Sequence, residues 1–172
     1  VKLTKHLDGY YYVEHLASTR AHPGAVEQTV RRTAEEDGTA IRVRLPIDPA
    51  QAGKYQAANF VRLLEGYRIT TVLTSGRGDK VTRAGIVAAQ ASPQSTGGQF
   101  GRFRVVRGTW NDAFFDELEA FPDGDFDDIV DAFGDAHHEL AEAVPFVPRA
   151  RKKHEPDSRY SDDGSFGDRG FE

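Results

Sequence analysis

The order of β-rich and helical segments in the first half of the chain constrains its fold more than any other feature. Two β-rich runs are joined by Asp8-Gly9, a dipeptide that favours a tight hairpin turn. Two predicted helices then alternate with two further β-rich runs. The predicted strands cover residues 1–7, 10–17, 39–47 and 67–74, and the predicted helices cover residues 25–36 and 50–65. This order predicts an α/β fold, in which a mixed sheet is flanked by helices.

The second half of the chain continues with shorter elements and ends in a polar tail. An apolar stripe at helical spacing follows Thr109 and is most simply part of the core. We expect a helix over residues 80–88, a loop over 92–101, a strand over 103–106 and two helices between 109 and 143. The prolines and charges that follow predict a domain over residues 1–144 and a disordered tail over 145–172.

Composition limits the kind of protein this can be. At 172 residues with 38% hydrophobic side chains, the chain suits a domain with a buried core. The absence of cysteine excludes disulfides and thiolate metal sites. No apolar run reaches the roughly 18 residues that a membrane span needs. The absence of methionine makes the chain look like a piece of a longer polypeptide.

An acidic cluster precedes and opens the last predicted helix. It consists of Asp123, Asp125, Asp127, Asp128 and Asp131. Because residues three or four apart share a helix face, we expect Asp131 to lie beside Asp127 or Asp128. Carboxylates held side by side repel each other unless a cation lies between them, and Mg²⁺ prefers such oxygen ligands. The alternative is an acidic, solvated helix start that the helix dipole stabilises.

Asp48 lies between a predicted strand and a predicted helix. The carboxyl end of a strand is where α/β sheets place ligand-binding groups, so Asp48 is a candidate site residue. The alternative is a structural one. Pro49 suits the first turn of a helix, and Asp48 would then cap that helix.

Charges of opposite sign are segregated along the second half of the chain. Between residues 76 and 108 there are six basic residues and one acid, whereas residues 109–143 hold twelve acids and no Lys or Arg. The basic residues are Arg77, Lys80, Arg83, Arg102, Arg104 and Arg107. A basic band next to an acidic cluster suits a polyanion that binds through its phosphates near a metal. Ordinary surface charge is the alternative.

Two rival motifs fail at their defining positions. The acidic cluster resembles the start of an EF-hand loop, but Asp128 stands at position six and Gly134 at position twelve. Ala52-Gly53-Lys54 resembles a phosphate loop, but Asp48 replaces its first glycine and Tyr55 its Ser or Thr. No ATPase motor is therefore predicted in this chain.

Three blocks of sequence resemble the C-terminal nuclease domain of the large terminase subunit of tailed phages. The blocks are residues 46–54, residues 80–84, and the segment from Trp110 through Phe121-Pro122-Asp123-Gly124 to Ala132. The similarity extends over about residues 1–143. It implies an RNase H-like fold and metal-dependent cutting of concatemeric double-stranded DNA while the genome is packaged.

The same resemblance implies roles for particular residues. Asp48, Asp127 and Asp128 would be the acids that hold Mg²⁺ or Mn²⁺, with Asp131 as a further ligand. In an RNase H-like sheet, the strand end that carries Asp48 faces the N-terminus of the last helix. Lys80 and Arg83 match the basic block of the family and would contact DNA phosphates, with a structural role as the alternative.

Two departures from the family pattern lower the expected activity. Phe126 stands where the family usually has His or a similar polar residue. The first acid of the family's site lies on a strand before the one that starts at Val1, so the fold is expected to lack its first strand. We therefore expect weak or no cleavage by this chain alone.

Partners and localisation also follow from the resemblance. Double-stranded DNA, the portal protein and the small terminase subunit are the expected partners, in the cytoplasm of the host and without a membrane. Two alternatives stay open. One is a non-catalytic module that docks onto the packaging machinery, and the other is a different RNase H-like nuclease such as a resolvase.

Overall fold

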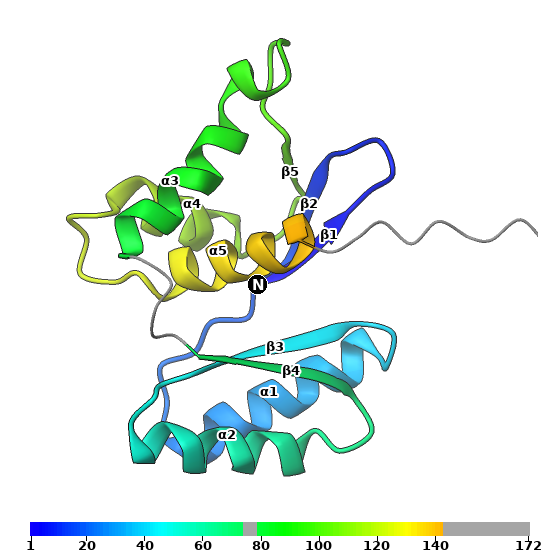
Figure 1. Ribbon diagram of the computed structural model, residues 1–172, viewed down its shortest axis with the longest axis vertical. Coiled ribbons are helices and arrows are strands. Elements are labelled where there is room, and N and C mark those ends of the chain that lie inside the picture. Colours follow the sequence, from blue (N-terminus) through cyan, green and yellow to red (C-terminus); the bar gives the residue numbers. More distant parts are fainter. Residues whose placement is uncertain (74–78, 143–172) are drawn as a thin grey trace, which may run out of the picture.

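The computed structural model describes residues 1–73 and 79–142 (Figure 1). Each strand and helix predicted within these residues is present, with its ends displaced by a few residues. In chain order the elements are β1 (Lys2–Lys5), β2 (Tyr11–His15), α1 (Pro23–Asp37), β3 (Arg42–Ile47), α2 (Gln51–Leu63), β4 (Arg68–Leu73), α3 (Lys80–Ala91), the 3₁₀ turn η1 (Pro93–Ser95), β5 (Phe103–Val105), α4 (Asn111–Ala120) and α5 (Asp128–Glu142). The predicted tail lies outside the described residues.

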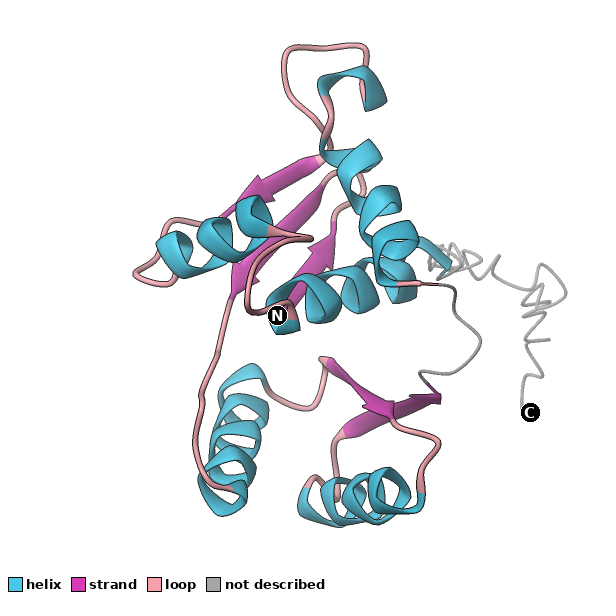
Figure 2. Ribbon diagram, turned by 90° about the vertical axis from the view of Figure 1, so that its left-hand side faces the viewer, coloured by secondary structure: helices cyan, strands magenta, loops and turns pink. Residues whose placement is uncertain are grey.

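The strands form two separate sheets. In the first, β1 pairs antiparallel with β2 through the predicted hairpin, and β2 pairs parallel with β5. This sheet is mixed, as the sequence predicts. In the second, β3 and β4 pair in parallel over their whole length, with α1 and α2 beside them (Figure 2).

The main core lies between the first sheet and helices α3, α4 and α5. Val13 of β2 is completely buried, and Phe114 of α4 is 2% exposed. The rings of Phe114 and Phe133 meet edge to face with their centroids 5.4 Å apart. This contact joins α4 to α5. Phe114, with the partly buried Trp110 and Leu118 packed nearby, puts most of the predicted apolar stripe after Thr109 in the core, whereas Phe115 is 43% exposed and lies outside it.

A groove of about 770 Å³ separates the two sheets. It is lined mainly by strands β1 and β3 and by helices α1 and α5, with single residues from β2, β4 and α3. Ion pairs cross between the two halves of the molecule: Lys2 pairs with Asp37 at 2.9 Å, and Arg42 and Arg44 both pair with Glu139. The first turn of α5 also reaches this groove, because Asp128 and Asp131 line it.

Over residues 1–73 and 79–142 no helix has the length and apolar character that crossing a bilayer requires. The longest helices are α1 and α5, each of 15 residues, and both carry several charges.

Candidate functional site

The first turns of α3 and α5 face each other and form a charged cluster. The Lys80 ammonium lies 2.6 Å from Oδ2 of Asp127 and 3.0 Å from Oδ2 of Asp131. The Arg83 guanidinium lies 2.8 Å from Oδ1 of Asp131. Asp127 precedes α5 and Asp131 stands one turn later, so the helical spacing brings both carboxylates to one face, as the sequence predicts. We call these four residues the acidic site.

Lys80 acts as the counterion of the acidic site. Its hydrogen bond to Asp127, followed by that to Asp131, raises the pKa of Lys80 above its ordinary value, although partial burial opposes this. The ammonium therefore stays charged at neutral pH, between two carboxylates. The side chains of Lys80, Asp127 and Asp131 are 35–40% exposed, so ions from the solvent can reach them.

The donor set of the acidic site fits a hard divalent cation. Mg²⁺ is commonly held by one or two carboxylates, and it keeps several of its waters. Oδ2 of Asp127 and Oδ2 of Asp131 already converge on one positive charge, the Lys80 ammonium. A divalent ion at that position would have to displace the ammonium.

Asp48 does not join this cluster. It is exposed beyond the end of β3, and its Oδ1 accepts a hydrogen bond of 2.8 Å from the Ala50 amide. Asp48 is therefore not the helix cap that the sequence left open, because the N-cap residue of α2 is Ala50 and no side chain caps the helix; the Asp48 carboxylate instead stabilises the turn before α2. Within residues 1–73 and 79–142 no three His, Cys, Asp or Glu side chains form a group able to hold a metal. Asp128 is exposed and faces the groove beside Asp131.

A model of the terminase RNase H-like domain family matches residues 1–140. The chain belongs to this family. The match confirms the resemblance and the fold class that we infer from the sequence, and it supports the role of a terminase nuclease domain. No curated protein and no solved structure matches the chain.

In this terminase domain the predicted basic band is divided between two places. Lys80 and Arg83 lie at the acidic site, and Arg77 lies outside the described residues. Arg102 donates to the Ser95 carbonyl at 3.1 Å, and Arg104 donates to the carbonyls of Gly101 and Phe103. The Arg104 guanidinium also lies over the Tyr10 ring, 4.3 Å from its centroid. Arg107 is exposed just after β5.

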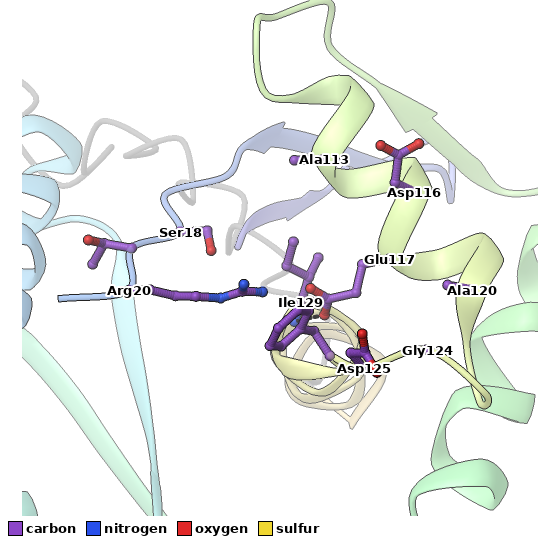
Figure 3. Close-up of a pocket in the computed structure, with 11 residues that line it drawn as sticks. Ser18, Arg20, Ala113, Asp116, Glu117, Ala120, Gly124, Asp125 and Ile129 are labelled. Carbon is purple, nitrogen blue, oxygen red and sulfur yellow. Dashed lines mark hydrogen bonds between the residues drawn. The ribbon is translucent and has the colours of Figure 1, made fainter.

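Glu117 belongs to the third sequence block that resembles the terminase family, although its place in the sequence predicted no role for it. Glu117 reaches from α4 to the start of α5, where its carboxylate accepts a hydrogen bond from the Ile129 amide at 2.5 Å. It lines a cavity of about 430 Å³ together with Arg20 and Phe126. Figure 3 shows Arg20 approaching from the β2–α1 connection and Glu117 from α4. The Arg20 guanidinium lies over the Phe126 ring, 3.2 Å from its centroid.

Proposed function

We propose that this terminase domain is a metal-dependent endodeoxyribonuclease that cuts concatemeric double-stranded DNA during genome packaging. The observation that carries the proposal is the convergence of Asp127 and Asp131 on one cation, the Lys80 ammonium. Family membership supplies the nuclease context, and the acid pair supplies ligands of the kind that phosphodiester hydrolysis by divalent ions uses.

Mg²⁺ or Mn²⁺ would be held by Asp127 and Asp131. Asp128, at the first position of α5, would join them only after its side chain moves, because among the described residues no three such side chains already form a metal-binding group. Such an ion, when bound, supplies activation of water and stabilisation of the charge that develops on the phosphodiester. Asp48 would contribute only after giving up its hydrogen bond to the Ala50 amide. Its assignment as a ligand therefore requires a change at the β3–α2 turn.

Lys80 and Arg83 have two successive roles in this proposal. Without a divalent ion they neutralise the acidic site and fix the side-chain positions of Asp127 and Asp131. If Asp127 and Asp131 held a divalent ion, the Lys80 ammonium would be released from them and would be available to a DNA phosphate. Arg102, Arg104 and Arg107 would contact the DNA backbone farther along, without reading bases.

Binding of Mn²⁺ tests the proposal most directly. Mn²⁺ added to the labelled protein should broaden the NMR signals of Asp127, Asp128 and Asp131 first. Asp127→Asn and Asp131→Asn should each weaken Mn²⁺ binding, and Asp128→Asn should do so to a smaller extent. Asp112→Asn removes the same charge at an exposed position of α4 and should leave binding unchanged.

Two results would count against the proposal. One is broadening confined to Asp123 and Asp125, and the other is equal binding by wild type and Asp131→Asn. Either would favour a non-catalytic module that docks onto the portal protein or the small terminase subunit through its acidic face. In a protein that cuts DNA, unchanged metal-dependent cutting by Asp131→Asn would also contradict the proposed role of the acidic site. Preferential cutting of branched DNA would favour a resolvase.

The remaining parts of the proposal concern the cellular setting. We infer double-stranded DNA as the substrate, and the portal protein and small terminase subunit as partners. The host cytoplasm is then the place of action. These inferences are supported by the family to which the chain belongs.

A further inference from the structure

The start of α5 is capped by a residue from a different helix. The first backbone bond of α5 runs from the Asp131 amide to the Asp127 carbonyl, which makes Asp127 the N-cap residue. The amides of the second and third helical residues, Ile129 and Val130, both point at Oε1 of Glu117, at 2.5 and 3.4 Å. The side chain of an N-cap residue ordinarily accepts a hydrogen bond from one of these two amides.

Helix α3 shows the ordinary arrangement in the same molecule. Its N-cap residue is also an aspartate, Asp79, and Oδ1 of Asp79 accepts from the Thr82 amide at 2.8 Å. Oδ2 of Asp79 accepts from the Thr82 hydroxyl, also at 2.8 Å. Both carboxylate oxygens of Asp79 are therefore turned back onto their own helix.

Asp127 differs from Asp79 in where its carboxylate points. Its Oδ2 accepts from the Lys80 ammonium at 2.6 Å, across the gap between α5 and α3. The amides of its own helix from which an N-cap carboxylate would accept, those of Ile129 and Val130, are bonded to Glu117 instead. Because the Glu117 carboxylate already accepts hydrogen bonds from those amides, the Asp127 carboxylate does not have to cap its own helix.

We propose that Glu117 is a positioning residue of the acidic site: by capping α5 from α4, it leaves the carboxylate of Asp127 free to face a cation. The part of this inference that concerns metal rests on the proposed function. The part that concerns the orientation of Asp127 rests on hydrogen bonds alone.

The burial around Glu117 explains why removal of its side chain should change the hydrogen bonding of Asp127. Ile129 and Val130 are 5% and 6% exposed, and Glu117 itself is partly buried beside the cavity of Figure 3. A buried amide that loses its acceptor is destabilised until it forms a hydrogen bond with another acceptor. A helix cap is at least as favourable as an ion pair that is more than a third exposed. Without Glu117, the carboxylate of Asp127 should therefore exchange Lys80 for its own helix.

The test combines an NMR signature with metal affinity in three versions of the protein. In the wild type, scalar coupling across the hydrogen bond should connect the Ile129 amide with the Glu117 carboxyl carbon. In Glu117→Ala, a new coupling should connect the Ile129 or Val130 amide with the Asp127 carboxyl carbon. The Mn²⁺ dissociation constant should rise roughly tenfold, as is usual when a group that orients a ligand is lost.

Glu117→Gln is the matched control because it removes the same charge and keeps an oxygen acceptor. It should preserve the orientation of Asp127 and the affinity for Mn²⁺. Glu119→Ala, an exposed acid on the same helix, should change neither. If Glu117→Ala does not fold, Glu117→Asp replaces it, because the side chain is one methylene shorter and its carboxylate lies farther from the amides of α5. It should show the same coupling between the Ile129 or Val130 amide and the Asp127 carboxyl carbon.

The inference is overturned if Asp127 gains no coupling to these amides once the Glu117 acceptor is removed. It is also overturned if Glu117→Gln weakens Mn²⁺ binding as much as Glu117→Ala does, because charge would then be the cause. If the wild type binds no Mn²⁺, the proposed function fails, and the coupling result alone decides the capping role.

Discussion

Lys80 has a role that its charge alone did not reveal. A lysine in a basic band suggests a phosphate contact, yet its ammonium lies between Asp127 and Asp131, which raise its pKa. At the residue scale, Lys80 therefore competes with any cation that would bind the same carboxylate oxygens. A DNA contact would follow only after that cation has taken its place.

Lys80→Met should strengthen the binding of Mn²⁺ to the acidic site. The ammonium no longer competes for the carboxylates, and a partly exposed ion pair of this kind accounts for roughly a two- to fivefold gain in affinity. Electron paramagnetic resonance of free Mn²⁺ measures the change. Lys54→Met, which removes an exposed lysine of α2, should have no effect, and weaker binding by Lys80→Met would contradict the competition.

His137 is a residue whose role lies entirely in the core. It is 4% exposed, and its ring packs edge to face on Tyr11 at 4.8 Å between centroids. Among the described residues, its Nε2 has no hydrogen-bond partner. Burial, followed by repulsion from His138 and Lys5, lowers the pKa of His137 below 6.5.

His137→Leu should change how stability depends on pH. In the wild type the unfolded chain binds a proton at His137 more readily than the folded chain. The contribution of neutral His137 is therefore complete above about pH 6.5 and is lost as pH falls through its lower folded-state pKa. Leu has no such loss, so the variant should gain stability relative to the wild type as pH falls from 7 to 5. Urea unfolding across this range measures it, with His22→Gln, which removes an exposed histidine just before α1, as the control. Parallel curves for His137→Leu and the wild type would contradict the prediction.

At the scale of elements, the turn from β3 into α2 depends on a close backbone approach. Asp48 accepts from the Ala50 amide, and the chain then passes so near Gly53 that a Cβ there would lie 2.5 Å from the Asp48 carbonyl oxygen. The same Cβ would lie 2.7 Å from the Cβ of Asp48. Gly53 is therefore required for the position of Asp48, a requirement that the sequence motif around it did not indicate.

Gly53→Ala should destabilise the domain and displace Asp48. Overpacking of this kind costs about 1–3 kcal/mol, and the Ala50 amide signal should shift as its hydrogen bond is disturbed. Gly85→Ala is the matched control, because a Cβ on this glycine of α3 meets nothing within 4 Å. That variant should be stabilised by about 1 kcal/mol through helix propensity. Equal stability of the two variants in thermal unfolding would contradict the steric argument.

At the scale of the whole molecule, ion pairs help to hold the two sheets together across the groove. Glu139 of α5 accepts hydrogen bonds from both Arg42 and Arg44 of β3, and Arg42 followed by Arg44 keeps the pKa of Glu139 below 4.5. The Arg44 side chain is only 11% exposed. Loss of Glu139 would leave this charge nearly buried without its carboxylate.

Glu139→Gln should lower the free energy of unfolding by about 2 kcal/mol at pH 7. Because the folded-state pKa of Glu139 is depressed, its contribution is present above about pH 4.5 and is lost as pH falls through the folded-state value. The curves of wild type and variant should therefore converge in acid. Glu142→Gln, whose side chain is 71% exposed, should differ little from the wild type at any pH. A difference that persists in acid would assign the effect to packing instead.

The sequence by itself determined the elements, their order and the side of α5 on which the acids lie. These follow from periodicity, turn residues and helix geometry, which act between neighbours in the chain. The order and spacing of its motifs also identified the family, and the match over residues 1–140 confirms it.

Only the tertiary structure decided which charges meet. Lys80 stands 51 residues from Asp131, Arg42 stands 97 residues from Glu139, and Glu117 reaches over to the amides of another helix. The packing of α3, α4 and α5 around Phe114 and Phe133 decides the role of each carboxylate. It decides which carboxylate caps a helix, which one forms an ion pair and which one is left for a cation. Side-chain hydrogen bonds act only over about 3 Å, so a linear pattern cannot rank these competing partners before the core has set their distances.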